Sequence, residues 1–382
     1  MTENLWKIPL FDLNYDESEE EAVLEVLHSK WLTAGPKTKE FEEKFNEYLS
    51  GNISSLAVSS CTAALHLSLL ACGIGPGDEI IISGLSFIAA LNIVTLTGAI
   101  PVLADSKSLY DWNISPDDIK AKLTPKTKAV IIVHFAGYPC DMDEILAICN
   151  EKNLILFEDV AHAIGGKYKN RMCGTFGQVS CFSFFSNKNL SVGEGGMVVT
   201  KDQELYEKLK LLRSHGMTSL TVERHYRKSI SYDVVMPGLN YRIDEIRSAL
   251  GIVQLRKLDG HNQKRRELVK EYHKQMSSLK DIIIPWNFDL HDRISSFHIF
   301  PILLPDKISR RMVMESLREK GIQTSIHYPA YNSFSAYKKT FPRNLKIADE
   351  ISRKVLTLPL YPTMSTLDVE FISSSFKEVL GE

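Results

Sequence analysis

A lysine that follows an apolar segment is the residue with the clearest chemical potential in this 382-residue sequence. Lys188 comes after the largely aromatic run 181–186 and precedes residues 193–196, three of which are glycine. A single loop lysine is usually a solvated charge. Glycines, however, allow a backbone to pack closely against a ligand, and loops at strand ends often carry function. The setting of Lys188 therefore favours an amine that lies in a ligand site.

A carboxylate at the end of another predicted strand supplies a partner for this amine. The apolar run 154–157 ends in Glu158 and Asp159. An aspartate at a strand end is often only a helix cap. With Lys188, it matches two groups that pyridoxal 5'-phosphate (PLP) chemistry requires, an amine that forms a Schiff base and a carboxylate that keeps the pyridine nitrogen protonated. The sequence thus predicts a PLP site with Lys188 and Asp159 as its catalytic residues.

Hydroxyl side chains near two predicted strand ends suit the phosphate of such a cofactor. Ser60, Cys61 and Thr62 lie in a polar loop that leads into an Ala- and Leu-rich helix. The free N–H groups at a helix N-terminus attract a phosphate, although an ordinary helix cap explains the same residues. Ser183, five residues before Lys188, adds another hydroxyl. We predict that these groups hold the phosphate.

Three other positions are candidates with structural alternatives. The ring of Phe87 either stacks on the pyridine ring or packs in the core. His162 comes three residues after Asp159, so in a helical turn it shares a face with Asp159 and can reach the cofactor's phenolic oxygen; otherwise it is simply packed. Asn240 and Arg242 form the polar tip before a strongly apolar helix, where Asn240 is either a ligand contact or a turn residue.

The elements that must position these residues alternate between strand and helix. This alternation predicts an α/β sheet, mostly parallel and covered on both faces, with ligands at the carboxyl ends of its strands. We expect a large domain over residues 1–255 and a smaller α+β domain over residues 256–382. Strands are predicted at 56–58, 79–83, 100–103, 129–133, 154–158, 180–185, 197–200, 282–284, 298–304 and 322–327. Helices are predicted at 17–30, 37–49, 62–72, 87–97, 115–122, 142–151, 203–213, 243–256, 259–278, 308–320 and 366–379.

Composition limits the other function classes. The formal charge is −2 and 24% of residues are charged, which does not suggest a nucleic-acid or membrane-surface protein. No apolar run approaches the roughly 20 residues of a membrane span, and the polar N-terminus lacks a signal peptide. Six cysteines without a CxxC pair indicate reduced thiols in a cytoplasmic protein. The 11 histidines show no metal-binding spacing, so no metal is expected.

Nearly the whole sequence, from about residue 8 to 380, resembles the DegT/StrS sugar aminotransferases, PLP enzymes with the aspartate-aminotransferase fold (fold type I). The ordered set of motifs is specific, although each motif alone is weak. The motifs lie at 31–36, 40–42, 60–65, 73–79, 158–159, 182–184 with Lys188, 193–196, 213–216, 238–242 and 327–329.

The resemblance implies a role for each matching position. Lys188 is the Schiff-base lysine and proton shuttle, and Asp159 pairs with the pyridine nitrogen. Asn240 reaches the phosphate of the neighbouring subunit, so a homodimer with shared active sites is expected. The implied cofactor-binding residues are Ser60, Cys61, Thr62, Phe87, Asp159, His162, Ser183, Lys188 and Asn240. The implied substrate-binding residues are Thr33, His215, Tyr241, Arg242, His327 and Tyr328.

Two departures from the family pattern affect these expectations. Cys61 stands where relatives often carry glycine, which its backbone N–H can tolerate unless the conformation demands glycine. The segment 330–334 lacks the usual further Pro and His, so the substrate is the least defined part of the site. Some relatives carry His at the lysine position and act as dehydratases, and Lys188 argues against that branch.

The implied reaction is a ping-pong transamination. L-Glutamate donates the amino group, and the acceptor is a nucleotide-linked 4-keto-6-deoxy sugar in surface-polysaccharide, lipopolysaccharide or deoxyamino-sugar biosynthesis. The stretch 232–234 followed by 240–242 resembles 4-aminating members more than 3-aminating ones, which tend to carry Ser before the Arg. A 3-keto sugar nucleotide or a cyclitol ketone remains an alternative acceptor. A non-catalytic PLP or sugar-nucleotide binding protein is a further alternative.

Overall fold

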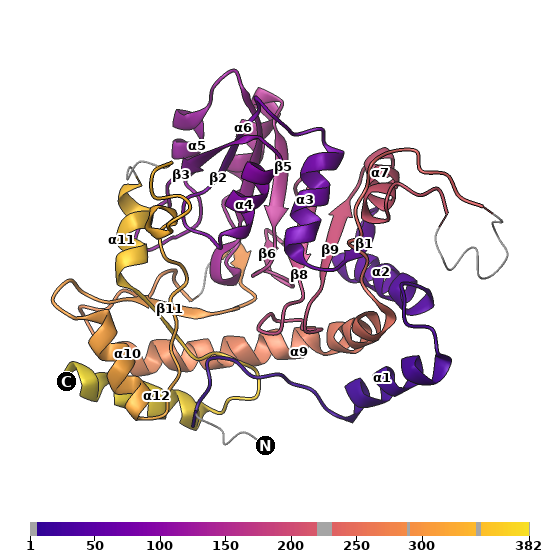
Figure 1. The fold of residues 1–382 in the computed structure, drawn as a ribbon. Coiled ribbons are helices and arrows are strands. Elements are labelled where there is room, and N and C mark those ends of the chain that lie inside the picture. Colours follow the sequence, from indigo (N-terminus) through magenta and orange to yellow (C-terminus); the bar gives the residue numbers. More distant parts are fainter. Residues whose placement is uncertain (1–5, 220–230, 289–290, 341–344, 382) are drawn as a thin grey trace.

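A seven-stranded sheet lies at the centre of the larger part of the molecule (Figure 1). The computed structural model describes residues 6–219, 231–288, 291–340 and 345–381. The strand order is β1-β9-β8-β5-β4-β2-β3; β9 is antiparallel to both neighbours, and the other neighbouring pairs are parallel. The strands are β1 (Ser54–Val58), β2 (Glu79–Ser83), β3 (Ile100–Ala104), β4 (Thr127–Val133), β5 (Ile155–Asp159), β8 (Val179–Ser183) and β9 (Gly196–Thr200). This confirms the predicted α/β class and all seven predicted strands of this part.

Helices cover both faces of this sheet because its strands are apolar on both sides. Ile80 and Ile82 of β2 pack in one core cluster, and Ile81 between them packs in another. The first cluster includes residues of α3 (Cys61–Ala71), α4 (Ala89–Leu96) and α7 (Gln203–Arg213). The second includes residues of α5 (Pro116–Lys122) and α6 (Met142–Lys152), and a third packs α2 (Pro36–Leu49) against β8 and β9.

A long helix connects this sheet to a smaller C-terminal unit. Helix α9 (Glu245–Met276) runs beneath the large sheet (Figure 1) and packs against α1 (Glu17–Ser29), α2 and α12 (Thr366–Leu380). The C-terminal unit also contains the antiparallel pair β11 (Phe300–Leu303) and β12 (Val355–Leu358), with α10 (Arg310–Glu319) and α11 (Lys346–Lys354). Short elements complete the fold: β6 (Lys167–Tyr168), β7 (Arg171–Met172), β10 (Arg293–Ile294) and the 3-10 turns η1 (Phe135–Gly137) and η2 (Tyr331–Ser333).

Three predictions for the second half of the chain were wrong. Segments 243–256 and 259–278 form one helix, α9, although Gly260 lies within it. A mid-helix glycine costs only about 1 kcal/mol, which extensive packing outweighs. Residues 322–327 and 282–284 are not strands; they make only isolated bridges, such as that between Ser325 and Thr357. The division at residues 255 and 256 falls within α9 and stays a prediction. In the described part of the chain, no helix has the length and apolar character needed to cross a bilayer.

Candidate active site

A cavity of about 380 Å³ lies where β5 and β8 end and α3 begins. Eight of the nine predicted cofactor-binding residues line it, together with two of the six predicted substrate contacts. These are Ser60, Cys61, Thr62, Phe87, Asp159, His162, Ser183 and Lys188, with His327 and Tyr328. Ser86, Phe185, Asn187 and Glu194 also line the cavity and were not predicted. The structure therefore brings residues from distant parts of the sequence into one place.

Asp159 is the last residue of β5 and is buried. Its Oδ1 accepts hydrogen bonds from the Ala161 N–H at 3.0 Å and the Cys61 thiol at 3.8 Å, while Oδ2 has no hydrogen-bond partner among the described residues. Burial raises the pKa of this carboxyl, and the Ala161 N–H and the Lys188 charge oppose that rise. Asp159 lines the cavity, and a mostly buried carboxylate with one unpartnered oxygen suits a positively charged N–H group from a ligand.

Lys188 lies in the turn that follows β8, where its N–H donates to the Phe185 carbonyl at 2.8 Å. Loss of hydration lowers the pKa of its amine to about 8, although the nearby Asp159 carboxylate acts in the opposite direction. Roughly a tenth of the amine is therefore uncharged at pH 7, far more than for an ordinary lysine. An uncharged amine is the form that attacks a carbonyl or accepts a proton.

One end of the cavity, where the sequence predicts the phosphate, is formed by the N-terminus of α3. Ser60 is the N-cap, and its Oγ accepts from the Ala63 N–H at 3.1 Å, so the helix-cap interpretation is also correct. The first N–H groups of a helix have no partner within it, which leaves those of Cys61 and Thr62 for an anion. Cys61 already belongs to the helix, a conformation open to any residue, so glycine is not required there.

Gly196 explains how closely β9 approaches this N-terminus. A Cβ atom at Gly196 would lie 2.5 Å from the Ser60 carbonyl carbon and 2.6 Å from the Cys61 nitrogen. No side chain fits at these separations, so this position must be glycine if the loop is to keep its place. The glycine-rich motif predicted to pack near a ligand therefore supports the helix end that would bind the phosphate.

An exposed aromatic ring borders the same cavity. Phe87 is 56% exposed, and its ring centroid lies 5.7 Å from that of Tyr328. Its backbone is tied down by the buried Tyr331, whose hydroxyl donates to the carbonyls of Phe87 at 3.4 Å and Ser83 at 3.3 Å. A large exposed ring held at a cavity offers a flat face for stacking.

Two further histidines of the cavity are fixed by hydrogen bonds. The Nδ1 of His162 accepts from the Ala136 N–H at 3.4 Å, so its Nε2 carries the proton and donates to the Tyr328 hydroxyl at 2.9 Å. The hydroxyl hydrogen of Tyr328 remains available for another acceptor. His327 instead bonds Thr357 at 3.0 Å through Nδ1, and burial lowers its pKa to about 3.

The remaining predicted positions do not line this cavity. Asn240 and His215 are exposed and lie on neighbouring backbone, since Ser214 and Asn240 form a bridge. Thr33 is exposed and pairs with Asp244, and the Tyr241 hydroxyl bonds His66 Nδ1 at 3.1 Å. Arg242 pairs with Val58 through its backbone, and its Nη1 is buried without a hydrogen-bond partner in the part of the chain that the structure describes. Their roles stay predictions.

Sequence reasoning missed two residues that contact or flank the lysine. His298 Nε2 lies 3.4 Å from Lys188 Nζ, and His298 Nδ1 lies 3.0 Å from Asn189 Oδ1. His298 stands 110 positions from Lys188 along the chain. The only signal in the sequence is a polar residue directly before the apolar strand β11.

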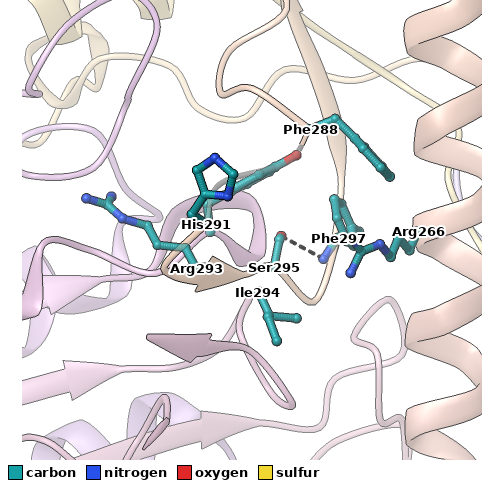
Figure 2. Close-up of a pocket in the computed structure, with 8 residues that line it drawn as sticks. Arg266, Phe288, His291, Arg293, Ile294, Ser295 and Phe297 are labelled. Atoms are coloured by element: carbon teal, nitrogen blue, oxygen red, sulfur yellow. Dashed lines mark hydrogen bonds between the residues drawn. The ribbon is translucent and has the colours of Figure 1, made fainter. Parts of the chain in front are cut away.

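A second cavity of about 300 Å³, seen in Figure 2, has none of the predicted site residues in its lining. Of the two arginines that line it, Arg293 pairs with Asp111 at 3.4 Å and with Asp141 at 3.2 Å. Its lining includes Ser295 and Phe297, two residues of the segment that carries His298. The full lining is Tyr138, Arg266, Phe288, His291, Arg293, Ile294, Ser295 and Phe297.

An amine and a buried carboxylate at the edge of this mixed sheet, next to a helix N-terminus, define a PLP-enzyme site. The chain belongs to the DegT/DnrJ/EryC1/StrS aminotransferase family, whose model matches residues 14–377. It is therefore a PLP-dependent transaminase, and its seven-stranded sheet is that of fold type I aminotransferases.

Three similar proteins match this chain along almost its entire length. It is 38% identical over 374 residues to the spore coat polysaccharide biosynthesis protein SpsC of Bacillus subtilis, with 95% of each chain covered. Helicobacter pylori PseC, an aminotransferase involved in the biosynthesis of pseudoaminic acid, superposes with a TM-score of 0.90 at 32% identity, covering 98% of this chain and 99% of PseC. The PLP form of Spr1654 from Streptococcus pneumoniae, described as a sugar aminotransferase, gives 0.89 at 28% identity, covering 98% and 97%.

Proposed function

We propose that this transaminase moves the amino group of L-glutamate to a nucleotide-linked 4-keto-6-deoxy sugar. The product would serve surface-polysaccharide or deoxyamino-sugar biosynthesis. In support, SpsC is named for spore coat polysaccharide biosynthesis and PseC for the biosynthesis of pseudoaminic acid. The observation that carries the proposal is the convergence of Lys188 and Asp159 in one cavity with a free helix N-terminus.

The residues of the cavity fit PLP in chemistry. The N–H groups of Cys61 and Thr62, with the hydroxyls of Ser60, Thr62 and Ser183, suit its phosphate. Asp159 suits its pyridine nitrogen, and Phe87 offers a stacking face. When bound, PLP links to an amine and withdraws electrons from the carbon that carries the substrate's nitrogen.

Lys188 is proposed to form the covalent link and to move the proton. Its lowered pKa supplies a neutral amine that can accept a proton from the substrate carbon and deliver it again. Asp159 keeps its negative charge because a protonated pyridine nitrogen compensates the cost of burying it. Tyr328, held by His162, directs its hydroxyl hydrogen to an acceptor in the cavity.

A homodimer with composite sites completes the proposal. Asn240 lies outside the cavity of its own chain, and a two-fold axis would make any contact with the partner's cofactor reciprocal. Exposed apolar side chains in two stretches of the chain support an interface, because a partner surface would remove them from water. In the described chain, six such residues lie between 11 and 32 and three between 232 and 235: Phe11, Leu13, Tyr15, Leu24, Leu27 and Leu32, with Tyr232, Val234 and Val235.

A panel of keto sugar nucleotides tests the proposed substrate. Each would be incubated with L-glutamate and PLP-loaded protein, and amination would be read by mass spectrometry. We expect the 4-keto-6-deoxy sugars to react fastest. Faster amination of 3-keto sugar nucleotides or of cyclitol ketones would support those acceptors instead. Absence of any amination, and of 2-oxoglutarate formation, would contradict the proposal.

A further inference from the structure

His298 contacts Lys188, although it is not one of the predicted cofactor-binding residues. It lies just before β11, in the segment 295–298. One side of this segment faces the second cavity, and the other side contacts the active site. Ser295 and Phe297 line the second cavity, where the Phe297 N–H donates to Ser295 Oγ at 2.9 Å (Figure 2). Ser296 Oγ donates to the His162 carbonyl at 2.7 Å on the side of the active site. The His298 backbone N–H donates to the Ala136 carbonyl at 2.9 Å. His298 is therefore held in a fixed place.

The hydrogen bonds around Asn189 determine which nitrogen of His298 carries the proton. Asn189 Nδ2 donates to the Ser296 carbonyl at 2.8 Å and to Asn262 Oδ1 at 2.7 Å. A backbone carbonyl can only accept, which fixes the orientation of the Asn189 amide. Asn262 is oriented in the same way, because its Nδ2 donates to the Ile164 carbonyl at 3.0 Å. Asn189 Oδ1 must then accept, so His298 Nδ1 is the donor in that 3.0 Å bond.

The opposite nitrogen of His298 consequently presents a lone pair to the lysine. A neutral histidine protonated at Nδ1 has an unprotonated Nε2. Burial and the positive charge of Lys188 lower the pKa of His298 well below its usual value, so the ring stays neutral. Nε2, at 3.4 Å from Nζ, is thus an acceptor for an N–H of Lys188.

We propose that His298, oriented by Asn189 and Asn262, is a positioning residue that accepts a hydrogen bond from Lys188 Nζ whenever this amine is not linked to the cofactor. Transamination releases the amine in each half-reaction, and the acceptor then keeps Nζ inside the cavity in one orientation. The inference rests on the role proposed above for Lys188.

The inference predicts a direction for the pKa of Lys188. An acceptor that faces an ammonium group favours its charged form, so loss of the acceptor lowers the pKa. Other titratable groups also face Nζ: the carboxylate of Asp159, the thiol of Cys61, and the rings of His162 and His327, which burial keeps neutral. Glu194 lines the same cavity. Substitutions at position 298 should therefore remove or keep the acceptor for Lys188 and leave these other groups unchanged.

Substitution of His298 by asparagine or by glutamine distinguishes the roles of its two ring nitrogens. The amide of His298→Asn reaches only the position of Nδ1, so it keeps the bond to Asn189 and loses the acceptor for Lys188. The longer His298→Gln can place its carbonyl at the position of Nε2. In apo-protein, acetylation of Lys188 with limiting acetic anhydride across a pH series, read by mass spectrometry of its peptide, gives the pKa without any cofactor. We expect a fall of about one unit or more in His298→Asn and a smaller change in His298→Gln.

The matched controls are the same two changes at His327, a histidine of the same cavity that bonds Thr357 instead. Neither His327→Asn nor His327→Gln should lower the pKa of Lys188. Equal titration of His298→Asn and His298→Gln, or a wild-type pKa in both, would overturn the inference. Failure of wild-type Lys188 to bind PLP covalently would instead overturn the proposed function.

A measurement on the unsubstituted protein covers the case in which the His298 variants do not fold. Nitrogen-15 chemical shifts of imidazole rings distinguish the two neutral forms of histidine. In labelled apo-protein we expect His298 to carry its proton on Nδ1 at neutral pH. A proton on Nε2 would place a donor against Lys188 and would refute the inference.

Discussion

The cofactor end and the substrate end of the proposed site differ in how completely one chain builds them. Strands β2, β5 and β8, with the segments that follow them, and helix α3 bring eight predicted cofactor residues into a single cavity. Four of the six predicted substrate contacts lie outside it, and His215 is exposed near the equally exposed Asn240. The carboxyl ends of strands place the cofactor residues within one chain. The exposed positions of the other residues agree with the proposed homodimer, in which a partner subunit would complete the site.

The largest expected effect is at the cofactor end. Lys188→Ala should lower turnover by more than about 10⁴-fold, because it removes both the covalent partner and the proton carrier. Thermal unfolding should remain cooperative. The matched control is Lys201→Ala, since burial also lowers the pKa of Lys201, whose Nζ donates to the Thr175 carbonyl instead. Wild-type turnover by Lys188→Ala, or equal loss in both variants, would contradict the assignment.

A change at Asp159 should separate rate from binding. Asp159→Asn removes the charge that stabilises the protonated pyridine nitrogen, so turnover should fall by roughly 10²- to 10³-fold. The phosphate contacts at α3 are untouched, and PLP content should fall much less. Both quantities come from steady-state assays and absorbance of the purified protein. A variant that loses all PLP, yet reaches the full rate with added cofactor, would show that Asp159 has only a structural capping role.

The substrate end gives a prediction about the partner. Asn240→Ala should weaken PLP retention by about 10- to 100-fold, the value of one hydrogen bond to a charged group, while Lys188 stays reactive. At a PLP concentration that loads the wild type but not Asn240→Ala, mixing Lys188→Ala subunits with Asn240→Ala subunits should restore activity, because one site of each mixed dimer then carries neither change. With subunit exchange verified by mass spectrometry, lack of restoration would rule out composite sites.

The smallest expected effect concerns the support of the phosphate loop. Gly196→Ala places a Cβ against the Ser60 backbone and should lower the free energy of unfolding by about 1–3 kcal/mol, with weaker PLP binding. Gly260→Ala is the matched control. A Cβ there meets no atom within 4 Å, so this helical position should gain up to about 1 kcal/mol. Denaturant titrations measure both, and equal shifts would show that close packing at Gly196 is unimportant.

Local patterns were enough to predict the cofactor end. Apolar strands with polar residues at their carboxyl ends locate Asp159, Ser183 and Lys188, because parallel strands place such ends at one edge. The N-terminus of α3 followed from its serine and its Ala-rich helix. The same patterns did not reveal that His162 bonds Tyr328, since that contact joins residues 166 positions apart.

Tertiary packing decided what the sequence alone did not predict. The sequence predicted two helices over 243–256 and 259–278, but contacts of α9 with α1, α2 and α12 accompany a single continuous helix. His298 lies far from Lys188 along the chain, and no motif in the sequence links it to Asn189. Their importance comes from a hydrogen-bond network that closes only when α9, β8 and the segment before β11 meet.

The assignment of Lys188 is tested most directly by trapping the cofactor on the protein. PLP-loaded protein would be reduced with borohydride, digested, and its peptides sequenced by mass spectrometry. We predict one phosphopyridoxyl group per chain, located on Lys188 and lost when L-glutamate is added before reduction. A group found on another lysine, or no stable attachment at all, would contradict the account.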